Sequence, residues 1–195
     1  MKARKVKRLD PDGPFRENSR RIVEVRLGEL SSLGSKALAA GAVKELHDAR
    51  IASKRLRYVL DLAGPAFGRP AADGARVARG LQDLLGEIHD CDVMLARLRE
   101  HADRLRAEDA EAVRLYAERP AADLEPEAAL EARNLDHYRG LEALAAYLAA
   151  RRKILFERFV REWQALERRD FAGGLLRALS APPPAPRARG DGGAP

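Results

Sequence analysis

The stretch KELHDARIASKRLRYVL, residues 44–60, decides the fold class of this 195-residue chain. Its apolar residues recur every three or four positions, which is the spacing of a helix that buries one side. At about 100° per residue these side chains gather on a single face. That face consists of Leu46, Ala49, Ala52, Leu56, Val59, Leu60 and Ala63. We therefore predict an amphipathic helix over residues 43–62.

The rest of the chain follows the same helical spacing, and the sequence contains no alternating strand pattern. We expect the 43–62 helix to end at Gly64-Pro65 and Gly68-Arg69-Pro70, because glycine and proline both interrupt helices. Ala, Leu, Arg and Glu dominate the composition, and all four favour helices. Further helices are predicted over residues 15–30, 71–106, 108–118 and 127–166. The predicted fold class is therefore all-α, an antiparallel bundle of long helices.

Both ends of the chain differ in composition from this helical part. Residues 1–13 hold a run of Lys and Arg and then a turn-forming Asp-Pro-Asp-Gly segment, which predicts a basic flexible arm. Residues 14–172 form the predicted helical domain. Gly173-Gly174 then predicts a loose C-terminus over residues 173–195, with a disordered tail rich in proline and glycine.

The overall charge and the single cysteine bear on the expected partner and the cellular location of the protein. The formal net charge is +6 and the isoelectric point is about 9.8, which favours an anionic partner such as nucleic acid or polyphosphate. Cys91 is the only cysteine, so no intramolecular disulfide can form. The N-terminus lacks the apolar core of a secretory signal, and no apolar run is long enough to cross a bilayer. These features predict a cytoplasmic protein without a membrane partner.

The side of the 43–62 helix opposite its apolar face carries a row of cationic side chains. His47, Arg50, Lys54 and Arg57 lie together there, and we call these four residues the basic strip. Like charges on one helix face repel by a few tenths of a kcal/mol per pair, and a multivalent anion would reverse that repulsion. At ~1.5 Å per residue the strip is about 15 Å long, which suits a chain of anions. A merely solvated charged face is the alternative interpretation.

Two blocks of sequence resemble a known family. HDARIASKRLRY, residues 47–58, is similar to the H-x-x-R-x-x-x-(K/R)-R-L-R-(Y) signature of the CHAD family, an α-helical domain named for its histidines. LQDLLGEIHDCDV, residues 81–93, resembles the L-Q-x-x-L-G-x-x-x-D block that follows in that family. The resemblance implies an all-helical protein that binds inorganic polyphosphate, at granules or in phosphate regulation, without an enzymatic reaction or a cofactor.

The resemblance also implies a set of binding residues and a possible assembly. Carried over position by position, the signature designates His47, Arg50, Lys54, Arg55, Arg57 and Tyr58. Longer family members carry the basic signature in two halves that line a concave surface, whereas this chain carries one clear copy. A homodimer would supply the second wall.

Five arginines outside the strip are further candidates for binding polyphosphate. Arg152 falls inside the apolar stripe of the last predicted helix, with Arg151 and Arg158 at its margin. A buried arginine requires a partner, so these residues either pair with acids or face a wet basic cleft. Arg76 and Arg79 on the 71–106 helix are weaker candidates, because most surface arginines are simply solvated.

The segment His89-Asp90-Cys91-Asp92 has the composition of a metal site but not its geometry. On a helix only His89 and Asp92 share a face, and two ligands make a poor zinc site. We therefore predict no metal, and expect Asp90 or Asp92 to pair with an arginine across the bundle. The His-Asp dipeptides at 47–48 and 89–90 leave a metal-dependent HD-type phosphohydrolase as one alternative. Nucleic-acid binding is another, favoured by the charge but not by the scarcity of aromatic residues.

Overall fold

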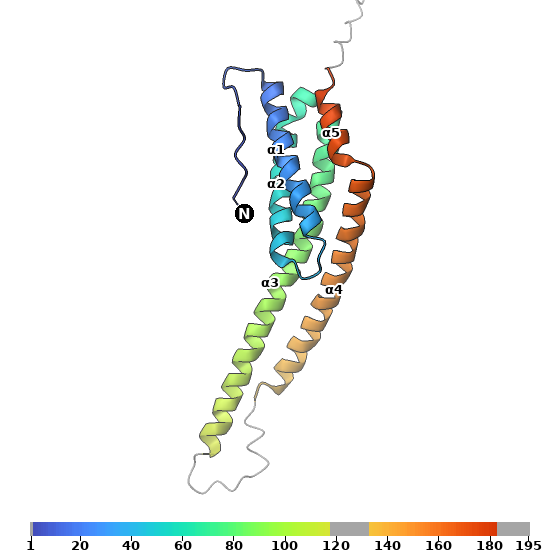
Figure 1. The fold of residues 1–195 in the computed structure, drawn as a ribbon. Coiled ribbons are helices and arrows are strands. Elements are labelled where there is room, and N and C mark those ends of the chain that lie inside the picture. The colour runs from blue at the N-terminus through green and yellow to red at the C-terminus, as the bar shows by residue number, and fades with distance from the viewer. Residues whose placement is uncertain (1, 118–132, 183–195) are drawn as a thin grey trace, which may run out of the picture.

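The computed structural model describes residues 2–117 and 133–182, and these residues contain five helices. No strand occurs within these residues, and the fold class is all-α as predicted. The helices are α1 (Phe15–Lys36), α2 (Val43–Phe67), α3 (Arg69–Ala117), α4 (Leu135–Arg168) and α5 (Phe171–Ser180). Figure 1 shows them packed as a bundle, with α3 and α4 continuing beyond it as a two-helix extension.

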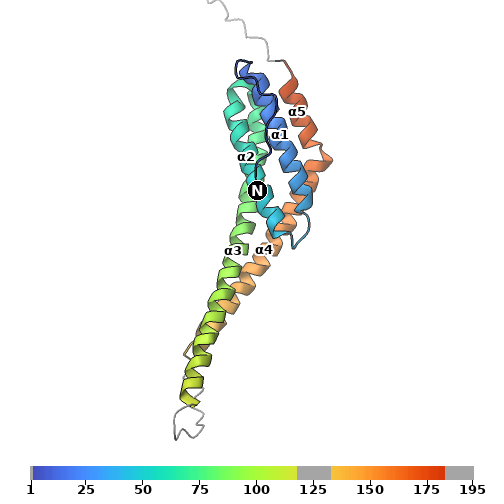
Figure 2. The same cartoon turned by 60° about the vertical axis from the view of Figure 1, so that its left-hand side comes forward.

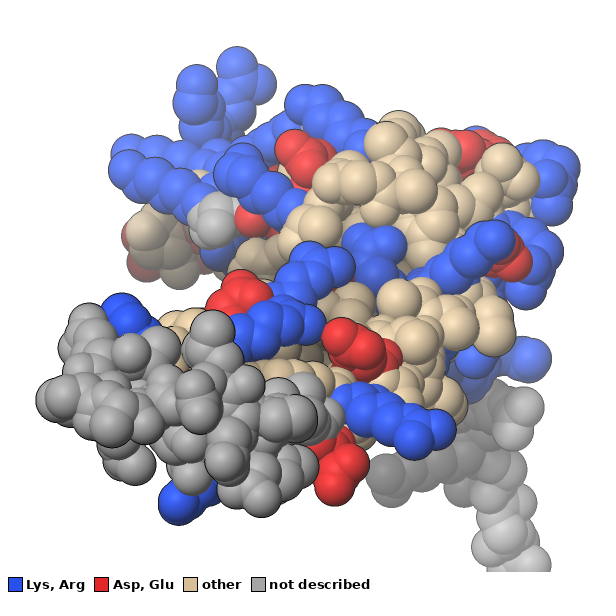
Figure 3. All heavy atoms as spheres, turned by 90° about the horizontal axis from the view of Figure 1, so that it is seen from below, with Lys and Arg blue, Asp and Glu red and all other residues tan. Residues whose placement is uncertain are grey.

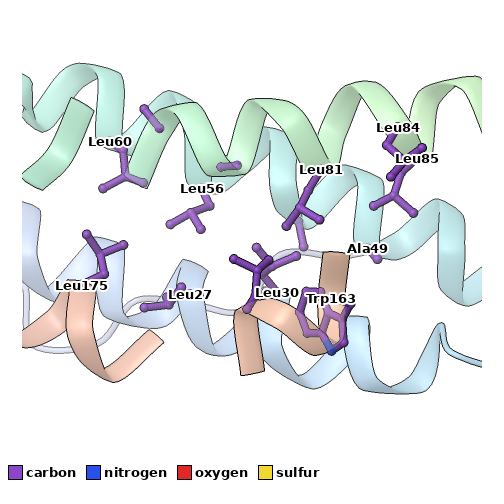
Figure 4. Packing of buried hydrophobic residues seen from close by; sticks show 14 of the residues in the cluster. Leu27, Leu30, Ala49, Leu56, Leu60, Leu81, Leu84, Leu85, Trp163 and Leu175 are labelled. Atoms are coloured by element: carbon purple, nitrogen blue, oxygen red, sulfur yellow. The ribbon is translucent and has the colours of Figure 1, made fainter. Parts of the chain in front are cut away.

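The core of the bundle lies where α2 faces α1 and α3. The apolar face predicted from the 44–60 stretch is buried there, with Leu46, Leu56 and Leu60 almost fully covered. Figure 4 shows Leu56 and Leu60 projecting, together with Leu81 of α3, into the space that Leu27 of α1 enters from the other side. Each fully buried Leu side chain stabilises the fold by about 1.5–3 kcal/mol through the hydrophobic effect.

The end of α2 differs slightly from its prediction. The helix continues past Gly64-Pro65 to Phe67 and ends at Gly68, whose φ is +62°. The N–H of Gly68 donates to the carbonyl oxygen of Gly64 at 2.7 Å. A residue without a Cβ adopts this left-handed conformation readily, so Gly68 rather than Pro65 reverses the chain into α3.

The predicted interruption between residues 106 and 108 does not exist. Instead α3 is one helix of 49 residues, because no glycine or proline follows Gly86 before its end at Ala117. Pairs spaced three residues apart, Asp103–Arg106 and Glu111–Arg114, support this stretch. The partner helix α4 begins at Leu135, and the earlier part of its predicted range lies mostly outside the described residues.

The C-terminal boundary predicted at residue 172 is wrong. Residues 171–180 form α5, and its Leu175 and Leu179 are buried in the core. Asp170 begins this helix from the left-handed region, and its side chain accepts a hydrogen bond from the Gly173 N–H at 3.2 Å. Burial of the leucines and this cap outweigh the low helix propensity of Gly173-Gly174. The predicted disordered tail falls largely on residues 183–195, outside the described part.

The predicted basic flexible arm makes specific contacts with α1. The backbone N–H of Arg4 donates to the carboxyl group of Glu29, which is buried although it is a polar side chain. Arg26 donates to the Arg4 carbonyl at 2.9 Å and to Glu29 at 2.6 Å. Figure 2 shows the segment lying along the bundle. Composition alone did not indicate these contacts, because they depend on how the folded chain places the arm beside α1.

None of the helices described in residues 2–117 and 133–182 has the length and hydrophobicity needed to cross a membrane.

Candidate anion-binding site

The basic strip of α2 lies against α3 in a fixed antiparallel register. The imidazole rings of His47 and His89 have centroids 4.8 Å apart. Three residues further along α2, the Nε of Arg50 lies 3.5 Å from the point where a Cβ would project from Gly86. The two helices therefore run antiparallel, so that three residues further along α2 correspond to three residues earlier on α3.

Extending this register brings one more cation to the strip. Lys54 comes level with Gln82, and Arg57 with Arg79. Arg79 is exposed, and it forms no ion pair with any residue that the structure describes. From this register we infer that Arg79 of α3 lies beside the C-terminal end of the strip.

Several polar atoms along this seam are buried without a hydrogen bond inside the described chain. They are Nδ1 of His47, Nε of Arg50, Nε of Arg57 and Oε1 of Gln82. Leaving such an atom unsatisfied costs about 1–3 kcal/mol. Both arginine side chains are half-buried overall, so part of each remains accessible to solvent.

No residue of the basic strip forms an ion pair within residues 2–117 and 133–182. Two cations of the strip make cation–π contacts with Tyr58 instead of ion pairs. The Arg57 guanidinium lies 4.5 Å and the Lys54 ammonium 5.8 Å from the centroid of its ring. An aromatic face attracts cations without neutralising them. Tyr58 itself is 47% exposed, so the aromatic ring and both cations border solvent together.

The three arginines predicted on α4 are paired with carboxylates. Arg152 donates from Nε and Nη2 to both carboxylate oxygens of Asp92 and from Nη1 to the Ala40 carbonyl. This confirms the expected pairing of Asp92 with an arginine across the bundle. Arg151 donates to Glu87 at 2.6 Å, and bonds to Tyr147 and Glu87 raise its pKa. Arg158 donates to Glu162 at 2.7 Å, which likewise raises its pKa.

Two other candidates also lie apart from the strip. Arg76 donates to Asp73 at 2.8 Å on its own helix. Arg55 is half-buried and, being five residues from Arg50, stands about 140° round α2 from it. It is engaged in an interaction of its own. Figure 3, a view from below, shows blue Lys and Arg atoms lying next to red Asp and Glu atoms at this end of the molecule. The basic strip, by contrast, is a row of four basic side chains without an ion pair in the described chain.

The structure does not assemble a metal site from the described residues. No group of three or more His, Cys, Asp and Glu side chains within them has the arrangement of a metal site. His47 and His89 do meet, although 42 positions separate them, but a third ligand is missing. Cys91 is buried, and this burial raises the pKa of its thiol.

The sequence indicated the strip but not the α3 residues that border it. In the sequence, His89 stands out only by its metal-ligating side chain, and Gln82 and Gly86 belong to the second block of the family resemblance. Helical spacing cannot identify such neighbours, because it says nothing about which helix packs against which face.

Comparison with family models agrees with the resemblance of the two sequence blocks. The family model of the CHAD domain, a domain associated with polyphosphate-related proteins, matches residues 2–99, half of the chain. The comparisons with curated proteins and with solved structures found no match. On the strength of the family model, this chain belongs to the CHAD domain family.

Proposed function

We propose that this protein binds inorganic polyphosphate through the basic strip of α2, without catalysing a reaction. One observation carries the proposal: His47, Arg50, Lys54 and Arg57 form a row on one helix face, and none of them is neutralised by a carboxylate within the described chain. The candidate arginines Arg151 and Arg152 on α4, by contrast, are held in ion pairs. Family membership supports the same ligand.

The shape of the strip favours a linear polyanion over a single small anion. Arg50, Lys54 and Arg57 project in sequence along about two turns of helix, so successive phosphates of one chain could each meet a cation. One guanidinium group can donate two parallel hydrogen bonds to the oxygens of a phosphate, and the Lys ammonium supplies a compact positive charge. Arg79 extends the row on α3. Binding of this kind releases counterions and therefore weakens steeply as salt is added.

The test compares two triple variants that change the net charge equally. Arg50→Gln, Lys54→Gln and Arg57→Gln remove three strip cations, while Arg97→Gln, Arg99→Gln and Arg104→Gln remove three exposed cations from the two-helix extension. Polyphosphate affinity is measured over a range of salt concentrations, and circular dichroism checks that both variants fold.

We expect the strip variant to lose at least tenfold in affinity, because three phosphate contacts disappear. Its slope of log affinity against log salt should fall by about 2, by analogy with single-stranded nucleic acid. The control should stay within about twofold of the wild type. Equal losses in both variants would instead indicate a diffuse charge effect, and an unchanged strip variant would remove this surface from consideration.

Nucleic-acid binding remains the second candidate because its ligand is also a polyanion. Near the strip only Tyr58 offers an exposed aromatic face among the described residues, which limits base stacking. Competition between polyphosphate and single-stranded RNA at one salt concentration separates the two ligands. A phosphohydrolase would release phosphate in the same samples. With polyphosphate as its ligand, the protein would act in the cytoplasm, at polyphosphate granules.

A further inference from the structure

The outer side of α4 carries an apolar row that the fold leaves uncovered. Ala143, Tyr147, Ala150 and Ile154 follow one another at intervals of four, three and four residues, the spacing of a coiled-coil seam. All four are exposed, with Tyr147 at 59% and Ile154 at 64%. We call these four residues the outer seam.

The outer seam is a second apolar face of α4 and not the edge of its buried one. The buried face contains Leu155, Phe159, Trp163 and Leu166, and its centre lies about 145° round the helix from the outer seam. Figure 1 shows α4 along one side of the molecule, with α3 on its other flank. A surface helix of a monomer needs only one apolar stripe, so the second stripe indicates a contact that the described chain does not supply.

The side chains of the outer seam are complementary to themselves under a two-fold axis. If a second α4 runs antiparallel with the axis between residues 148 and 149, Ala143 faces Ile154 of the other copy. In the same alignment Tyr147 faces Ala150. Each large side chain then meets a small one, which is how facing layers fill space without voids or overlap. A parallel alignment would instead place Tyr147 against Tyr147 and Ile154 against Ile154.

The charges beside the outer seam favour the same antiparallel alignment. Arg139 and Glu157 flank the seam on the same side, and each is exposed without an ion pair in the described chain. The two-fold axis that matches large to small residues also brings Arg139 opposite Glu157 of the second copy, at both ends of the contact. In a parallel alignment the two copies of each residue would lie on opposite sides of the seam, so Arg139 could not meet Glu157.

From this self-complementarity we infer that the protein forms a homodimer through an antiparallel contact between the outer seams of two α4 helices. The inference does not depend on polyphosphate binding. The contact spans residues 139–157, about 27 Å of helix. One helix face per copy is a small interface, so the dimer should dissociate on dilution.

Sedimentation velocity over a dilution series, without any polyanion, tests the dimer directly. Ile154→Lys introduces a charge into the seam and should weaken association at least tenfold. Leu62→Lys is the matched control, because Leu62 is 73% exposed on α2, away from the seam. A wild type that stays monomeric at all concentrations would overturn the inference, as would equal weakening by both substitutions.

Charge reversal tests the alignment as well as the location. Arg139→Glu and Glu157→Arg each place like charges opposite one another in a homodimer, and each should weaken association. Mixing the two variants restores both attractive pairs in a heterodimer, so the mixture should associate more tightly than either variant alone. A mixture no tighter than its components would contradict the antiparallel alignment, whereas recovery would support it.

Discussion

The guanidinium of Arg152 on α4 and the carboxylate of Asp92 on α3 form a two-pronged ion pair across the bundle. Both side chains are largely covered, at 16% and 14% exposure. This pair explains how an arginine can occupy an apolar helix stripe, because its charge is matched by an acid and its third nitrogen by the Ala40 carbonyl. In this respect Arg152 differs from the residues of the basic strip, which form no ion pair within the described chain.

Replacing Arg152 should therefore affect stability and not ligand binding. Arg152→Met keeps the length of the side chain but leaves Asp92 without its partner, so the free energy of unfolding should fall by about 1–3 kcal/mol. Polyphosphate affinity should stay within about twofold, since the strip keeps its charges. Urea denaturation and a binding titration on the same sample measure both quantities. A variant of normal stability that no longer binds would assign Arg152 to the binding surface.

Gly34 of α1 and Trp163 of α4 pack so closely that no Cβ fits between them. A methyl group at Gly34 would overlap the indole ring. Gly34→Ala should therefore lower the free energy of unfolding by about 1–3 kcal/mol, although alanine favours helix by about 1 kcal/mol. Trp163 is the only tryptophan, so its fluorescence reports the local displacement.

Gly28, six residues earlier on α1, serves as the control for this packing effect. A Cβ there would have its nearest neighbour at 4.0 Å, so Gly28→Ala should raise the stability by up to about 1 kcal/mol. Opposite signs for the two substitutions would establish steric exclusion by Trp163. Stabilisation by both would show that the indole can move aside.

The start of α5 should make the stability of the fold depend on acid pH. The hydrogen bond from Arg177 and that from the Gly173 N–H lower the pKa of Asp170. Because the folded pKa is below the unfolded one, this contribution is present above the ordinary carboxyl range and is lost as the pH falls through the folded value.

Asp170→Asn isolates that charge, since asparagine can still cap a helix and adopt the left-handed conformation. We expect the wild type to be the more stable of the two at neutral pH. The difference should shrink as the pH is lowered, measured by urea denaturation at each pH. Two curves that remain parallel down to low pH would show that the carboxylate charge contributes nothing at this position.

The local pattern of the chain was sufficient to predict the all-α fold class, the buried face of α2 and the composition of the strip. The apolar spacing of residues 44–60 predicted which face of α2 is buried, and the same wheel placed His47, Arg50, Lys54 and Arg57 together. Both results depend only on helix geometry, which a sequence carries in its residue spacing. Errors arose where local propensity was weak evidence, as at Gly173-Gly174, where burial of Leu175 and Leu179 outweighs a poor helix former.

Tertiary packing alone decided which distant residues meet. It brought His89 and Gly86 of α3 to the strip, gave Arg152 its partner Asp92, and left the outer seam of α4 uncovered. Residues close in sequence are related by a fixed rotation along one helix, whereas the register between helices is set by how side chains from several of them fill a common core. No periodicity within a single segment contains that information.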